Sequence, residues 1–116
     1  MKYVDINSIP LDHVSHNPEI KKQVMLHPGD APNLIYFSQA QFKPGHIAAG
    51  HFHTDMSEIF FVERGEGTIT INNYAHRLQP GVCVVVHPGD VHEVENTGQQ
   101  DLVLTYFAIQ AENVKD

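Results

Sequence analysis

The stretch that decides the fold is Gly45-His46-Ile47-Ala48-Ala49-Gly50-His51-Phe52-His53-Thr54-Asp55-Met56-Ser57-Glu58. It holds two histidines two residues apart, followed by a carboxylate five residues after the second histidine. Because residues two apart on a β-strand share one face, His51 and His53 are expected to present their imidazoles side by side. The interval to Glu58 is long enough for a tight turn and the start of a return strand.

A second segment, Pro88-Gly89-Asp90-Val91-His92-Glu93-Val94-Glu95-Asn96, supplies a third imidazole. Three neutral imidazoles and one carboxylate form a ligand set that suits a divalent transition metal. The sequence therefore predicts a metal site built from four side chains, namely His51, His53, Glu58 and His92.

The two segments resemble the two sequence motifs of the cupin family of small β-barrels. Motif one reads Gly, five residues, His-x-His, three or four residues, Glu, six residues, Gly, and the chain meets it in full from Gly45 to Gly65. Motif two reads Gly, five residues, Pro-x-Gly, two residues, His, three residues, Asn. The chain meets its other positions with Gly81, Gly89, His92 and Asn96, but His87 occupies the proline position and Pro88 follows one place later.

The resemblance implies an all-β fold, a single cupin jelly-roll barrel of antiparallel strands (a double-stranded β-helix). It also implies one divalent transition metal ion, with iron, manganese, nickel, zinc and copper all permitted. Cupins with this ligand set include dioxygenases, decarboxylases, isomerases and lyases, and among these we favour dioxygenase-type chemistry. Similar cupins commonly pair through their sheets, which implies a homodimer.

Turn residues and alternating apolar positions indicate β-structure from Leu34 onward. We expect strands at Leu34–Phe42, Ile47–His53, Glu58–Glu63, Thr68–Ile71, Val82–Val86, His92–Glu95 and Leu102–Ile109, with a hairpin turn at Asn72-Asn73. The barrel is expected to span residues 34–110, with an N-terminal arm at 1–33 and a polar tail at 111–116.

Four prolines in the arm argue against long regular elements there. Asn17-Pro18-Glu19 could cap a single helical turn, whereas Gln23-Val24-Met25-Leu26 could equally form a strand.

Strand alternation also suggests which residues wall the cavity. If the ligands point into the barrel, Phe60 and Val62 share the face of Glu58, while Val94 and Asn96 share the face of His92. Tyr36 and Phe42 are further candidates, on a strand whose inward face the sequence does not fix. Either Tyr36, Ser38, Ala40 and Phe42 point inward, or Ile35, Phe37, Gln39 and Gln41 do.

The outward face of the Glu58 strand carries Ile59 and Phe61, so both faces are apolar. Such a strand is typical of a sheet that also packs against another sheet or subunit, which again favours a homodimer.

The composition limits the class of partner. The 116 residues suit one domain, and 14 acidic against 7 basic residues give a net charge of −7, which argues against nucleic-acid binding. No apolar run is long enough to cross a bilayer, and the start shows no secretory signal. Cys83, the single cysteine, is interpreted as a small buried hydrophobe. Together these features indicate a cytoplasmic protein with no nucleic-acid or membrane partner, and the resemblance to cupins implies a small-molecule ligand.

The expected function is that of a metal-dependent enzyme acting on a small organic substrate. Four protein ligands leave about two positions open if the metal is octahedral, and open positions distinguish catalytic from structural sites. Glu58 is also a candidate catalytic residue, because a carboxylate that leaves the metal can take a proton. Two alternatives stay open: a non-catalytic module that binds a small molecule, and a structural metal protein.

Overall fold

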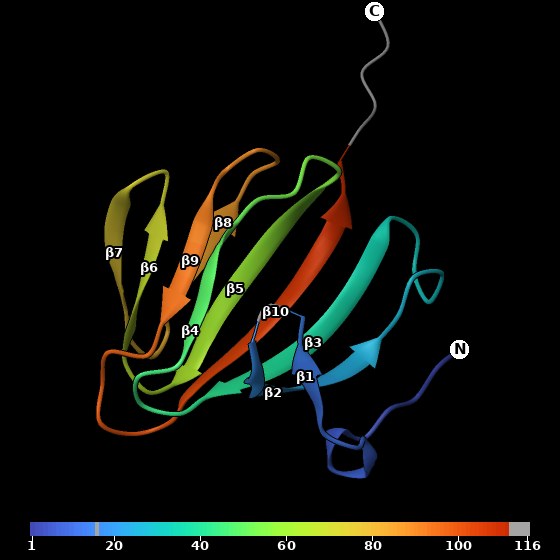
Figure 1. The fold of residues 1–116 in the computed structure, drawn as a ribbon. Coiled ribbons are helices and arrows are strands. Elements are labelled where there is room, and N and C mark those ends of the chain that lie inside the picture. The colour runs from blue at the N-terminus through green and yellow to red at the C-terminus, as the bar shows by residue number, and fades with distance from the viewer. Residues whose placement is uncertain (16, 112–116) are drawn as a thin grey trace, which may run out of the picture.

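The fold consists of two antiparallel sheets that face each other (Figure 1). A computed structural model describes residues 1–15 and 17–111. The larger sheet has the strand order β1-β2-β3-β10-β5-β8, and the smaller sheet has the order β4-β9-β6-β7. The strands are β1 Asp12–Val14, β2 Asn17–Leu26, β3 Leu34–Phe42, β4 Ile47–His51, β5 Met56–Arg64, β6 Gly67–Ile71, β7 Tyr74–Leu78, β8 Cys83–Val86, β9 His92–Glu95 and β10 Leu102–Gln110, and a short 3-10 helix, η1, spans Ile6–Ser8.

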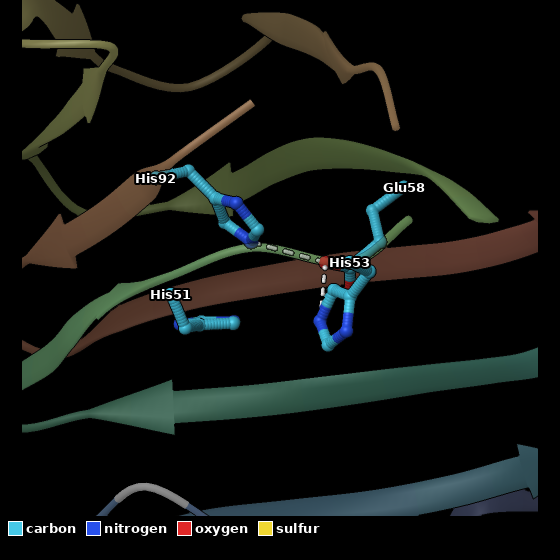
Figure 2. A group of neighbouring side chains, drawn as sticks. All are labelled: His51, His53, Glu58 and His92. Carbon is cyan, nitrogen blue, oxygen red and sulfur yellow. Dashed lines mark hydrogen bonds and ion pairs between the residues drawn. The ribbon is translucent and has the colours of Figure 1, made fainter. Parts of the chain in front are cut away.

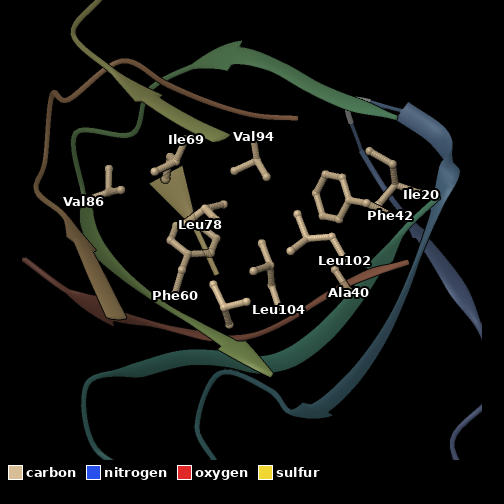
Figure 3. Close-up of a cluster of buried hydrophobic side chains, with 11 residues drawn as sticks. Ile20, Ala40, Phe42, Phe60, Ile69, Leu78, Val86, Val94, Leu102 and Leu104 are labelled. Carbon is tan, nitrogen blue, oxygen red and sulfur yellow. The ribbon is translucent and has the colours of Figure 1, made fainter. Parts of the chain in front are cut away.

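The core lies between the two sheets, where the inward faces of the strands meet (Figure 3). Its side chains include Phe60, Val62 and Leu104 from the larger sheet and Ile69 and Val94 from the smaller one. The two sheets pack face to face and, within the described residues, do not join into one hydrogen-bonded ring. The all-β jelly roll expected from the sequence is confirmed. No helix in the described part of the chain has the length and apolar character to cross a membrane.

The expected strands from Leu34 onward are present, and β3 and β9 have the predicted bounds. The hairpin between β6 and β7 turns at Asn72 and Asn73, whose φ angles are 49° and 70°. Two consecutive positive φ angles are typical of a type I′ turn, which asparagine tolerates better than most residues. The hairpin predicted at this pair is confirmed.

The helical turn considered at Asn17-Pro18-Glu19 is wrong, because these residues begin the ten-residue strand β2. Register pairing between β2 and β3 begins at Lys21, so Pro18 lies outside that ladder and its missing N–H breaks no bond in it. Ile20 is fully buried and anchors β2 to the core. The arm therefore contributes two strands to the larger sheet. Of the expected polar tail, residues 112–116 lie outside the described residues.

The strand expected at Val82–Val86 is present as β8, but the interpretation of Cys83 there as a buried residue is wrong. β8 lies at the edge of the larger sheet, so Val86 points into the core while Val85 is 46% exposed. Cys83 shares the outer face and is exposed rather than buried.

Candidate metal centre

The four predicted ligands come together at one end of the space between the sheets (Figure 2). Each residue offers one ligand atom, and these atoms lie within 4.8 Å of one another. His51 ends β4 directly opposite His92, the first residue of β9. Glu58 lies on β5 in the facing sheet, and its Oε1 is 3.1 Å from Nε2 of His92 and 3.5 Å from Nε2 of His53. The group can therefore hold a metal ion.

His53 is placed differently from the sequence expectation, because β4 ends at His51. The carbonyl oxygen of His53 accepts a hydrogen bond of 2.7 Å from the backbone N–H of Gly89. The two imidazoles are still neighbours, with ring centroids 5.1 Å apart. A contact with the loop before β9, rather than a strand ladder, holds this ligand.

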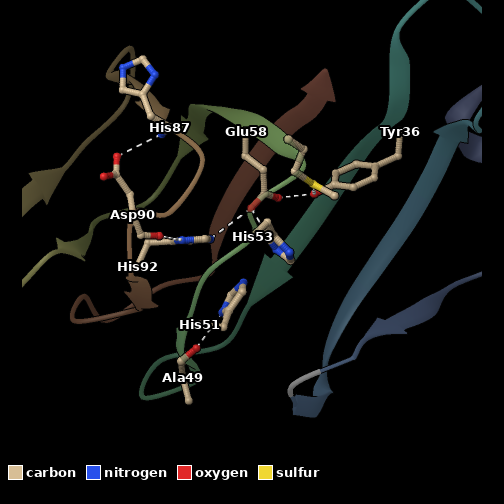
Figure 4. Close-up of polar contacts among 9 residues, drawn as sticks. Tyr36, Ala49, His51, His53, Glu58, His87, Asp90 and His92 are labelled. Carbon is tan, nitrogen blue, oxygen red and sulfur yellow. Dashed lines mark hydrogen bonds and ion pairs between the residues drawn. The ribbon is translucent and has the colours of Figure 1, made fainter. Parts of the chain in front are cut away.

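Two of the histidines have their ring orientation fixed by backbone carbonyls (Figure 4). Nδ1 of His92 lies 3.1 Å from the carbonyl oxygen of Asp90, and Nδ1 of His51 lies 2.8 Å from that of Ala49. A carbonyl can only accept, so each Nδ1 carries the proton and donates it. Both Nε2 atoms are thereby left as the ligand atoms, as metal-binding histidines require.

The loop that carries Gly89 is a tight turn, His87-Pro88-Gly89-Asp90 (Figure 4). The Asp90 N–H donates to the His87 carbonyl, and the Asp90 carboxylate accepts from the His87 N–H, both at 3.0 Å. Gly89 has φ +87°, as the third residue of a type II turn needs. The displaced proline is therefore the second residue of this turn, and His87 is a turn residue outside the ligand group.

The tip of the β6–β7 hairpin holds the same loop. The amide of Asn72 donates to Asp90 Oδ1 and accepts from the Val91 N–H, both at 2.9 Å. The Asn72 N–H also donates to the Val91 carbonyl at 2.8 Å. Asn72 thus fixes the backbone segment whose Asp90 carbonyl orients His92.

Glu58 is a buried carboxylate with several donors around it. It is 5% exposed, and the hydroxyl of Tyr36 donates to its Oε2 (Figure 4). Burial alone would raise the pKa of Glu58, but hydrogen bonds from His92 and Tyr36 and the nearby histidine charges hold that pKa below its usual value. Glu58 is therefore ionised at neutral pH, as a metal ligand must be.

The pKa values of His92, Tyr36 and Tyr106, which lie around Glu58, are raised, whereas the pKa of Glu58 is lowered. Burial would lower the pKa of His92, but its hydrogen bonds to Glu58 and to the Asp90 carbonyl raise it overall. Burial and the Glu58 charge raise the pKa of Tyr36, and the same two causes raise the pKa of Tyr106 to about 12. Both tyrosines are therefore protonated at neutral pH and can donate hydrogen bonds.

The ligand group forms part of the wall of a cavity of about 250 Å³ between the sheets. Four of the pocket candidates line it: Phe60, Val94, Tyr36 and Phe42. Ser38 and Ala40 also line the cavity. Of the two faces of β3 that the sequence left open, the inward one is therefore the face with Tyr36, Ser38, Ala40 and Phe42.

Two pocket candidates lie elsewhere. Val62 is 1% exposed and packs in the core, outside the cavity lining. Asn96 follows the end of β9, and its amide donates to the Phe42 and Gln100 carbonyls and accepts from the Gly98 N–H. These bonds use the Asn96 side chain to fix loops, so shared strand parity with Val94 does not bring it to the cavity.

Other lining residues were missed by the sequence reasoning. Lys22 and Val24 come from β2, which the proline spacing concealed, and Tyr106 comes from β10. Alternation along Leu102–Gln110 would have placed Tyr106 on the same face as Leu104 and Ala108. Met56, two residues before Glu58, also lines the cavity and was not singled out.

The donor set fits a divalent transition metal. It combines imidazole nitrogens and a carboxylate oxygen, has no thiolate, and has two histidines whose Nδ1 atoms donate to backbone carbonyls, which directs Nε2 toward the other ligands. Carbonyl groups that accept from Nδ1 in this way are typical partners of metal-ligating histidines.

We expect Asn72→Ala to weaken metal affinity about 10-fold, the lower end of the effect of losing a direct partner of a ligand, because Asn72 acts on His92 through the Asp90 carbonyl. The substitution frees the Asp90–Val91 segment and with it the orientation of His92. Competition with a chelator of known affinity measures the change. Asn73→Ala is the matched control, since it also removes an asparagine at positive φ but breaks no side-chain bond to this loop in the described structure. Equal losses in the two variants would show that turn strain, and not the loop contact, is responsible.

As pH rises above 6.5, the metal-free fold should lose stability, whereas the affinity for metal should increase. The His92–Glu58 pair stabilises the metal-free fold in full between pH 4.5 and 6.5, the ordinary pKa values of the two groups. This stabilisation is lost as pH falls through the lowered pKa of Glu58 or rises through the raised pKa of His92.

Metal needs a neutral His92, so we expect metal affinity to fall steeply as pH drops below about 6. Calorimetric titration in two buffers of different protonation enthalpy measures both the affinity and the proton release. An affinity that stays constant into mildly acidic solution would contradict this expectation.

Comparison with known proteins supports the same family as the motifs. The family model described as the cupin domain matches residues 38–108. An oxalate-binding protein from Thermotoga maritima is 30% identical over 66 residues, which cover 57% of this chain and 54% of that protein. The match therefore spans about half the length of that curated relative.

Several solved structures share the fold. A predicted oxalate decarboxylase from Thermotoga maritima has a TM-score of 0.86 at 22% identity and covers 95% of this chain and 100% of its own. KdgF from a Halomonas species has a TM-score of 0.79 at 20% identity, over 97% and 96% of the two chains. The polyketide cyclase RemF from Streptomyces resistomycificus has a TM-score of 0.79 at 17% identity, over 97% and 80%. These structural similarities show a shared fold. Because the cupin family model matches more than half of the chain, the protein belongs to the cupin family.

Proposed function

We propose that this chain is a metal-dependent enzyme that acts on a small organic molecule in the cavity between its sheets. The observation that carries the proposal is the convergence of four ligand atoms, within 4.8 Å of one another, on the wall of a cavity. Metal ligands that border a cavity leave room for a substrate, whereas a structural site is closed by its own ligands. The volume of about 250 Å³ lies below the usual range of about 300–1,000 Å³ for drug-sized ligands, which favours a small substrate.

A metal bound here would act as a Lewis acid on a carbonyl or carboxylate oxygen, or would acidify a water molecule. The chain supplies the surroundings. Phe60, Val94 and Leu104 give the cavity an apolar wall that excludes water. Tyr36 keeps its proton because its pKa is raised, and its hydroxyl donates that proton in a hydrogen bond to Oε2 of Glu58, which orients the carboxylate at the cavity wall.

Glu58 is proposed to have two roles. It is a metal ligand, and because its carboxylate is ionised and lines the cavity, it can also take a proton from a bound substrate. The charge of Glu58 also favours the imidazolium form of His92 when no metal is bound. Metal binding must therefore displace a proton from His92.

The names of relatives, rather than the geometry, support the choice of a reaction class to test. Three of the proteins reported above are named as an oxalate-binding protein, a predicted oxalate decarboxylase and a polyketide cyclase. Those names give no support to the dioxygenase chemistry favoured on the sequence. Decarboxylation of a small carboxylic acid is accordingly the first reaction to assay, with isomerisation and oxygenation next. A non-catalytic binding module remains the alternative function, since the same cavity and ligands serve binding alone.

We also propose that two copies of the chain pair through the outer face of the larger sheet. Leu26, Phe37, Phe107, Ile59 and Val85 stand opposite one another in register across five strands and form an apolar row on that face. Phe61, on the same face of β5, is 39% exposed. Such a contiguous apolar patch favours a protein partner, and a second copy would cover the row with its own.

We expect about one iron, manganese, nickel, zinc or copper per chain, and loss of this metal in a His51→Ala/His53→Ala variant. Elemental mass spectrometry on untagged protein measures the content. His13→Ala/His76→Ala is the matched control, because it removes two exposed histidines away from the centre. The metal-loaded enzyme should release CO₂ from a small carboxylic acid, and Glu58→Gln should lower that rate by at least about 100-fold.

Three results separate the alternatives. Metal with ligand binding but no turnover of any assayed substrate would favour the binding module. Unfolding of the protein when the metal is removed, without ligand binding, would favour a structural metal. No metal after reconstitution would overturn the proposal.

For the pairing surface, we expect light scattering to give twice the chain mass of 13.0 kDa at micromolar concentration. Phe61→Lys/Val85→Lys should give a monomer, because it places two charges on the apolar row. Tyr74→Lys is the control, since Tyr74 is 74% exposed on the other sheet. A wild-type monomer at these concentrations would exclude the dimer.

A further inference from the structure

We propose that Lys22 recognises a carboxylate at the end of the ligand far from the metal centre, so that the substrate is an elongated organic anion. This inference rests on the proposed metal-dependent function and deepens it by naming the substrate class. Two observations support this role: Lys22 lines the cavity, and it forms no ion pair with any described residue.

The Lys22 side chain points toward the interior. On β2, Ile20 is fully buried in the core and Val24 lines the cavity, and Lys22 stands between them in the strand alternation. The alternate residues face outward: Lys21 is exposed, and the amide of Gln23 donates to carbonyl groups of the N-terminal segment. Lys22 itself is half-buried and lines the same cavity as the metal ligands.

No described residue forms an ion pair with the Lys22 ammonium. Asp12 stands opposite Lys22 in the β1–β2 register, but the two form no ion pair, and the Asp12 carboxylate accepts from the His13 N–H instead. A half-buried lysine lays its aliphatic stem along the cavity wall and keeps its ammonium accessible. A carboxylate bound in the cavity would give this ammonium an ion-pair partner.

The charge of the cavity favours an anion as well. Among its described lining residues, Glu58 is the one carboxylate, and its oxygens already contact His92, His53 and Tyr36. A divalent metal together with Lys22 outweighs this single negative charge. The cavity is then electropositive inside a chain whose net charge is −7.

The register gives the length of the ligand. Tyr36 and Glu58 lie at one level of the larger sheet, since both pair with Ala108 of β10. Lys22 pairs with Ala40, four residues farther along β3 than Tyr36. Four residues correspond to roughly 13 Å along a strand, a separation that the side chains at both ends shorten.

One rung of the sheet separates these two levels. Its residues are Val24, Ser38, Tyr106 and Phe60, which stand opposite one another across four strands and all line the cavity. The rings and the aliphatic side chain of this rung suit a short hydrocarbon segment. The cavity therefore fits a molecule with one oxygen-rich end at the metal, an apolar middle and a carboxylate at Lys22. Oxalate is too short to reach both ends.

The test compares succinate, glutarate and adipate with their monoamides, in which one carboxylate is replaced by a neutral amide. Calorimetric titration of the metal-loaded protein measures each affinity. We expect at least one dicarboxylate to bind about tenfold or more tightly than its monoamide, and this preference to disappear in Lys22→Met, which keeps the stem but not the charge. Lys22→Arg should keep the preference, and oxalate affinity should not change in either variant.

Lys21→Met is the matched control, since it removes the adjacent, exposed lysine. A preference unchanged in Lys22→Met, or no such preference in the wild type, overturns the role of Lys22 while normal metal binding leaves the proposed enzyme intact. Failure of the wild type to bind metal overturns the proposed function and this inference together. A change in melting temperature alone, with the preference intact, would assign Lys22 to the stability of the β1–β2 pair and also overturn the inference.

Discussion

The buried Glu58 carboxylate is the charge on which the interior of this jelly roll depends. An isolated carboxylate at 5% exposure would be strongly destabilising, or would be forced to take a proton. Here His92, His53 and the Tyr36 hydroxyl surround it, and their contacts keep its pKa below the usual value. The three partners come from three segments on both sheets, so the carboxylate ties the sheets together at the same place where it would bind a metal.

The geometry of this centre depends on loops more than on strand ladders. His53 lies beyond the end of β4 and is held by Gly89, while the Asp90 carbonyl orients His92. The hairpin tip at Asn72 fixes that loop in turn. A chain of hydrogen bonds therefore connects the edge of the smaller sheet to the ligands. This arrangement explains how the chain dispenses with proline at its usual place in motif two: the turn keeps its shape with Pro88 as second residue and Gly89 as third.

The sequence predicted which four residues form the candidate metal group, and most of the strands, because both depend on local spacing. His51, His53 and Glu58 come together in the fold, as their spacing along the sequence predicted, and β3 and β9 have the expected bounds. Features that depend on tertiary position were not predictable in the same way. The burial of β8 is decided by its place at a sheet edge, and the inward face of β3 is decided by its neighbours β2 and β10. Asn96 shared parity with cavity residues, but the chain leaves the strand before it.

The N-terminal arm shows the same limit most clearly. Its prolines suggested an irregular segment, yet a strand tolerates Pro18 where no ladder bond to β3 is needed. Lys22, on that unpredicted strand, is the charged residue that gives the cavity an end distinct from the metal centre.

The histidines and Glu58 are proposed to hold one metal and to leave positions on it open to solvent or ligand. X-ray absorption spectroscopy of the metal-loaded protein tests this directly. We expect three imidazole nitrogens and a carboxylate oxygen around the metal, with further light-atom ligands that change when oxalate is added, and one imidazole fewer in His92→Ala. A closed four-coordinate shell that oxalate does not alter, or an unchanged imidazole count in the variant, would contradict it.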